Sequence, residues 1–149
     1  MAESLRNQPL LTPVELESRL DELYASLEQF NEGWYFESHE TLEDLWMVTP
    51  YPEREMFQGI IQAAAAFVHL VRGEYPGVLK LLDAAVEKLQ RAEQGRFGID
   101  ITRFAEELMG ARDEISSLGP GGFQTWPESH VPRIRFEGES ERGRSLSPD

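Results

Sequence analysis

The chain has 149 residues, of which 40% are hydrophobic and 28% charged, so it is long enough for one soluble domain with its own core. Its formal net charge of −13 argues against direct contact with nucleic acid or an anionic membrane surface, because both attract basic proteins. The sequence contains no cysteine, which excludes disulfide bonds, thiolate catalysis and cysteine-based metal sites.

The N-terminal residues lack a basic segment followed by an apolar one, so they do not resemble a secretory signal. The longest uncharged run is the 16 residues from Met56 to Val71, which include two glutamines and a histidine. A membrane-spanning helix needs about 20 mostly apolar residues. We therefore expect a cytoplasmic protein with no membrane span.

The predicted elements begin after a flexible N-terminal arm at 1–11. Thr12, Pro13 and Glu15 are typical of a capped helix start, and leucines then recur at helical spacing as far as Phe30. Gly33 ends this first helix. A second helix is predicted at 35–47, before a proline-rich turn.

The third helix is predicted at 52–72, with apolar residues on almost all sides, so other elements should surround it. A fourth helix is expected from Pro76 to near Gly95, and a fifth at 101–118 with Asp100 as its cap. The result is an all-α bundle domain of about five helices at 12–118, with an extended, partly disordered tail at 119–149. Within that tail, 131–136 can form at most an edge strand.

The second predicted helix carries ionisable residues on its apolar face. His39 and Glu43 lie four residues apart within the apolar arc, and Glu40 lies at its edge. Burying such groups is costly unless they are paired, hydrogen-bonded or metal-bound. The pattern therefore predicts a small polar site inside a helical core.

The third predicted helix carries a matching polar stripe of Gln58, Gln62 and His69, with Arg54 one turn before Gln58. A short connection should pair the second and third helices antiparallel. If Met47 lies near Arg54, the two polar stripes meet along a shared line.

Three interpretations of this site remain open. The first is a hydrogen-bonded network that sets the register between the two helices, built from His39, Glu43, Gln58 and Gln62 with Arg54. The second is a divalent metal held by His39 and Glu43, four residues apart, with Glu40 or His69 as a further ligand. The third is a metal-free site for a small polar molecule. His39-Glu40-x-x-Glu43 has a glutamate where the zincin motif has its second histidine, so no peptidase is inferred.

The same residues carry a family resemblance. The run from Phe30 to Trp46, followed by Gln58-Gly59-Ile60-Ile61-Gln62 and His69, resembles the small bacterial and archaeal family called domain of unknown function 309. The resemblance covers roughly 27–90, departs mildly at 73–78, and does not extend beyond Leu118. It implies a compact, all-helical domain, and some classifications label the family a predicted metal-dependent hydrolase.

We favour a non-catalytic structural or protein-interaction module, which would bind an unknown protein or small molecule but neither nucleic acid nor membrane. The alternative is a metal-dependent hydrolase that uses His39, Glu40 and Glu43 as ligands or base. No cofactor is certain, and a divalent metal is the one that the pattern allows. Apolar residues around the third helix, such as Phe57, Phe67 and Val68, also leave room for a homo-oligomer.

Overall fold

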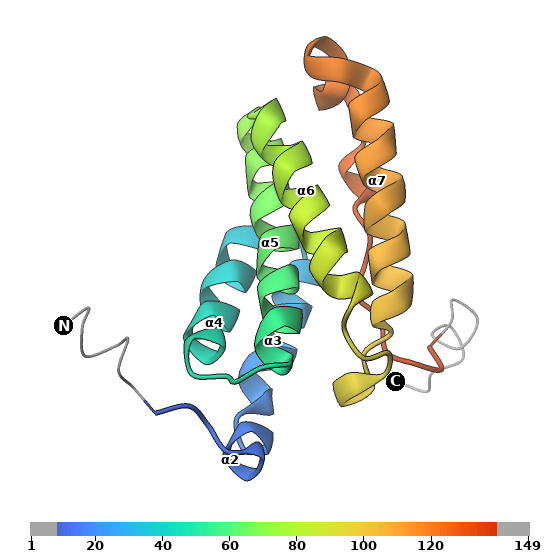
Figure 1. Cartoon of the computed structure of the whole chain (residues 1–149). Helices are drawn as coiled ribbons and strands as arrows, with labels where there is room; N and C mark the ends of the chain where they lie inside the picture. The colour runs from blue at the N-terminus through green and yellow to red at the C-terminus, as the bar shows by residue number, and fades with distance from the viewer. Residues whose placement is uncertain (1–8, 140–149) are drawn as a thin grey trace, which may run out of the picture.

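The computed structural model describes residues 9–139, and in that range the protein is all-helical (Figure 1). Five of its six α-helices are longer than two turns. The bounds are α2 Pro13–Glu17, α3 Leu20–Asn31, α4 Tyr35–Met47, α5 Glu53–Arg72, α6 Tyr75–Gln90 and α7 Ile101–Gly122. Three short 3₁₀ turns follow or precede α7: η1 Arg96–Gly98, η2 Phe123–Thr125 and η3 Glu128–His130. The predicted fold class is confirmed.

The first predicted helix is divided into α2 and α3. Its start is correct, since Thr12 and Glu15 form a reciprocal capping box. The helix nevertheless stops at Glu17, where the Ser18 hydroxyl donates to the Glu15 carbonyl at 2.7 Å. A serine hydroxyl that bonds to a nearby carbonyl competes with continuation of the helix. Leu16, Leu23 and Leu27 are all buried, so the apolar face continues across the break.

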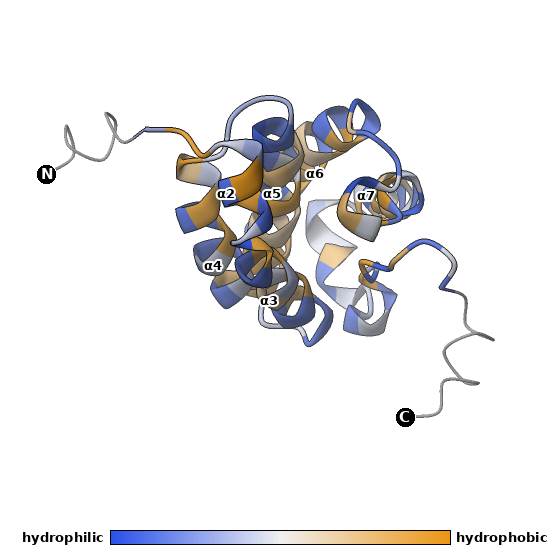
Figure 2. Ribbon diagram, turned by 90° about the horizontal axis from the view of Figure 1, so that it is seen from below, coloured by the Kyte–Doolittle hydropathy of each residue, from blue (hydrophilic) through white to orange (hydrophobic). Residues whose placement is uncertain are grey.

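Helix α5 is the central element, as predicted. It packs against α4 on one side and α6 on the other, and in Figure 2 its apolar surface is enclosed by the neighbouring helices. Gly59 allows close approach to α6, because a Cβ there would lie 2.8 Å from Leu89 Cδ2. Gly73, with φ of 75°, ends α5 in the left-handed conformation that favours glycine.

Aromatic residues join the halves of the bundle. Phe30 at the end of α3 makes edge-on contacts with Tyr35, Phe67 and Phe104, with ring centroids 5.3, 6.0 and 5.5 Å apart. These four residues come from α3, α4, α5 and α7. Edge-to-face pairs of this kind add to the stabilisation from apolar burial, so the core is continuous across four helices.

The segment after α7 returns along the bundle. Trp126 is buried, lies parallel to Phe67 with centroids 6.3 Å apart, and donates its indole N–H to Glu114 at 2.8 Å. Asn31 binds Ile134 through both backbone groups, at 2.9 and 2.8 Å. The expected edge strand at 131–136 is reduced to one antiparallel bridge between Ile99 and Phe136. Up to residue 139, then, the predicted tail is packed against the helices.

The last ten residues of that tail and the first eight of the predicted arm lie outside the described range. The division into arm, bundle and tail stays a prediction. No helix within residues 9–139 is long and apolar enough to cross a membrane.

Candidate functional site

The α4/α5 polar strip is defined as His39, Glu43, Trp46, Arg54, Gln58 and Gln62. All of these except Trp46 were predicted from the sequence as site residues. Arg54 fixes the register between α4 and α5. Its Nη1 lies 3.4 Å from the carbonyl oxygens of Trp46 and Met47. The Arg54 guanidinium also lies 4.4 Å from the centre of the Trp46 ring. Arg54 therefore caps the C-terminal carbonyls of α4 and adds a cation–π contact. This places Met47 beside Arg54, as the antiparallel pairing required.

His39 and Glu43 are only loosely paired. The His39 Nε2 atom lies 3.9 Å from Glu43 Oε2, beyond hydrogen-bond distance, and the two side chains are 28% and 44% exposed. Phe36 stacks against the His39 ring with centroids 6.3 Å apart. The other ring nitrogen, Nδ1, is buried and has no hydrogen-bond partner.

The predicted hydrogen-bonded network is not formed. Among residues 9–139, no hydrogen bond joins His39, Glu43, Gln58 or Gln62 to one another. Gln62 Oε1 and Trp46 Nε1 are instead buried without partners. The strip lies at the margin of the α4/α5 contact, whereas the deepest face of α4 is formed by Tyr35, Ser38, Leu42 and Leu45.

The fully buried polar contact of α4 faces α3, and the sequence analysis missed it. Ser26 donates to the Ser38 carbonyl at 2.9 Å, and the two hydroxyl oxygens lie 3.1 Å apart. Ser38 falls within the apolar stripe at helical spacing, three residues from Tyr35 and four from Leu42. The small polar side chain of Ser38 within an apolar stripe was the sequence signal that could have predicted this contact.

Of the residues proposed as metal ligands, His39 and Glu43 lie 3.9 Å apart, but within residues 9–139 no third ligand joins them. His69 lies near the other end of α5, with Nδ1 at 2.5 Å from Glu74 Oε1 and its ring against Gly77. Glu40 is exposed on α4. In the described part of the chain, no group of three or more His, Asp or Glu side chains could hold a metal ion. The set His39, Glu40, Glu43 and His69 does not fit the three-ligand centre that a hydrolytic metal needs.

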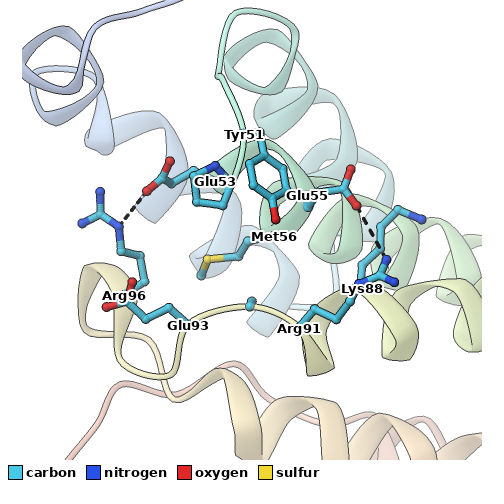
Figure 3. Close-up of a pocket in the computed structure, with 10 residues that line it drawn as sticks. Tyr51, Glu53, Glu55, Met56, Lys88, Arg91, Glu93 and Arg96 are labelled. Carbon is cyan, nitrogen blue, oxygen red and sulfur yellow. Dashed lines mark hydrogen bonds and ion pairs between the residues drawn. The ribbon is translucent and has the colours of Figure 1, made fainter.

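A cavity of about 500 Å³ lies at the end of the bundle where the α4–α5 turn meets the segment after α6 (Figure 3). Its apolar lining residues are Tyr51, Pro52, Met56 and Ala92, and its charged lining residues are Glu53, Glu55, Lys88, Arg91, Glu93 and Arg96. The residues come from 51–56 and 88–96, which no local spacing rule connects. The sequence analysis did not predict this site.

Comparison with known proteins supports the resemblance but adds no activity. Residues 23–81 match the sequence model described as Domain of unknown function (DUF309). The uncharacterized protein YpuF of Bacillus subtilis (strain 168) is 30% identical over 87 residues, which are 56% of this chain and 50% of that protein. The chain thus spans about half the length of this curated relative. No solved structure matches. The resemblance predicted from the sequence is confirmed, and residues 23–81, from within α3 to within α6, carry the match to the DUF309 family.

Proposed function

We propose that this domain is a non-catalytic module that binds a protein partner through the α4/α5 polar strip. The observation that carries the proposal is the set of three buried polar atoms without hydrogen-bond partners: His39 Nδ1, Trp46 Nε1 and Gln62 Oε1. Each such atom costs stability, so native proteins rarely leave several without a reason. Because these atoms are buried in the isolated domain, the side chains over the strip must move before a partner can supply an acceptor for the indole N–H and a donor for the amide oxygen.

Exposed aromatic side chains extend the same surface. Phe36, which stacks on His39, is 48% exposed, and Trp34 just before α4 is 58% exposed. Aromatic residues are enriched in protein interfaces, where they contribute much of the binding energy. From Phe36, one turn before the strip, to Trp46 this surface extends over ten residues, or about 15 Å along α4. That length suits a helical or extended protein segment better than a small molecule.

Site-specific photo-crosslinking tests the proposal. Benzoylphenylalanine would replace Phe36 in the full chain, and the control would carry it at Leu118 of α7, which is 41% exposed. We expect a discrete protein adduct at position 36 and none at position 118. Trp46→Phe, which removes the indole N–H but keeps an aromatic ring for Arg54, should reduce the yield. Equal adducts at both positions, or none at position 36, would contradict the proposal.

The hydrolase alternative has its own test. If His39, Glu40 and Glu43 held a divalent metal, protein purified without chelator would contain it in stoichiometric amount, and His39→Ala and Glu43→Ala would both lose it. We expect sub-stoichiometric metal in all three proteins, because within residues 9–139 no third ligand joins His39 and Glu43. Stoichiometric metal that is lost in both variants would contradict the non-catalytic module and support the metal-dependent hydrolase.

A further inference from the structure

The cavity at the end of the bundle is separate from the α4/α5 polar strip and shares no residue with it. Its volume of about 500 Å³ falls within the range of small-molecule sites. Tyr51 at its rim is 79% exposed, whereas Met56 beneath it is 2% exposed. An exposed aromatic ring above a buried thioether offers two apolar surfaces to a side chain placed between them.

The charges around this apolar interior are separated into two groups. In Figure 3 the Glu53–Arg96 pair lies at one end, near Glu93, and the Glu55–Arg91 pair lies at the other, near Lys88. The first group contains two carboxylates and one cation, so it carries one net negative charge. The second group contains two cations and one carboxylate, so it carries one net positive charge.

The existing ion pairs leave one unpaired charge at each end. Arg96 Nε lies 2.9 Å from Glu53 Oε2, and that glutamate side chain is only 15% exposed, so the pair is fixed. Arg91 and Glu55 are 3.8 Å apart and largely exposed, which makes them a weak pair. Within residues 9–139, neither Lys88 nor Glu93 has an ion-pair partner. Lys88 and Arg91 therefore favour an anion, and Glu93 favours a cation.

The backbone beside the cavity is strained. Phe97, directly after Arg96, has φ of 58° and ψ of 21°, a left-handed conformation that is rare for a bulky residue. The Arg96 guanidinium stacks over its ring at 4.0 Å, and Tyr24 donates to its carbonyl at 3.0 Å. Strained residues of this kind persist where the surroundings hold them, often beside binding sites. Phe97, which adjoins the lining residue Arg96, is thus held by contacts to its ring and to its carbonyl.

We propose that this cavity binds a short apolar peptide in its zwitterionic form. The terminal carboxylate lies at Lys88 and Arg91, the terminal ammonium lies at Glu93, and an apolar side chain lies between Tyr51 and Met56. A fatty acid would match only the positive end, and an apolar amine only the negative end. A zwitterion with an apolar body matches both ends and the interior, and this inference is independent of the partner proposed for the α4/α5 polar strip.

Titration calorimetry of the full chain with trileucine tests this inference. We expect saturable binding that is lost or weakened when the peptide is N-acetylated and also when it is C-amidated. Lys88→Gln and Glu93→Gln should each weaken binding roughly three- to fivefold, the effect of losing one partly exposed charge contact. Tyr51→Ser should weaken it about tenfold through lost apolar contact.

Lys80→Gln is the matched control, because Lys80 is exposed on the same helix and does not line the cavity. It should bind trileucine as the parent does. All of the substituted side chains reach the surface, and circular dichroism would verify that the helices are retained. Absence of binding, equal affinity for the blocked peptides, or equal loss in Lys80→Gln and Lys88→Gln would overturn the proposal.

Discussion

Replacing Gln62 by methionine tests whether its amide oxygen is hydrogen-bonded in a polar network or lacks a partner in the folded domain. The Gln62 amide oxygen is buried without a hydrogen-bond partner, and the residue lies in the middle of α5. Methionine is also unbranched and of similar length, and it is a good helix former. The substitution therefore removes the unsatisfied oxygen while it changes packing and helix propensity little.

The expected magnitude follows from the cost of one buried, unpaired polar atom, which is about 1–3 kcal/mol. Because the Gln62 side chain is only half-buried, we take the lower end. The free energy of unfolding should rise by about 1 kcal/mol in Gln62→Met. With a denaturant slope of about 2 kcal/mol per molar in urea, the unfolding midpoint should rise by about 0.5 M.

Gln58→Met is the matched control. Gln58 lies one turn earlier on the same strip, and neither of its amide atoms is among the buried, unpartnered ones. Its unfolding free energy should stay within about 0.5 kcal/mol of the parent. A loss of 1 kcal/mol or more in Gln62→Met alone would refute the reasoning. It would mean that the amide oxygen is hydrogen-bonded in the folded protein, as the sequence-based network required.

Two further predictions concern packing and pH. Gly59→Ala should lower the melting temperature, because its Cβ would lie 2.8 Å from Leu89 Cδ2 and overpacking costs about 1–3 kcal/mol, more than the gain in helix propensity. Gly110→Ala should raise the melting temperature, because nothing lies within 4 Å of its new Cβ. If thermal unfolding shows both melting temperatures shifting in the same direction, this explanation is wrong. Burial, and secondarily the charge of Glu128, raise the pKa of Tyr35 from 10.0 to about 12, so the neutral phenol is favoured in the folded state. The resulting stability is complete below pH 10 and is lost as the pH rises towards 12, and Tyr35→Phe should flatten that decline in urea unfolding measured across this range.

Local sequence signals predicted the ends of those helices whose boundaries depend only on neighbouring residues. Helix α4 has the predicted bounds, and α5 ends before Gly73 as expected, because Gly73 adopts the left-handed conformation that commonly ends helices. Asp100 caps α7 by accepting from the Arg103 N–H at 3.3 Å. By contrast, α6 ends at Gln90 rather than near Gly95, since the following residues turn to form the cavity wall and to meet Phe136.

The candidate sites depend on more than helical phase. The spacing of His39, Glu43 and Gln62 predicted that two polar stripes would share one side of the α4/α5 pair. The contact of Arg54 with the Met47 carbonyl agrees with the predicted antiparallel register. Periodicity gives the direction of a side chain around its own helix axis, but not how far a neighbouring helix covers it. That coverage buries Ser38 against Ser26 and leaves His39 and Glu43 at the margin. The cavity at the bundle end arises in the same way, from two segments more than thirty residues apart, because only packing of α5 against α6 brings their charges to one place.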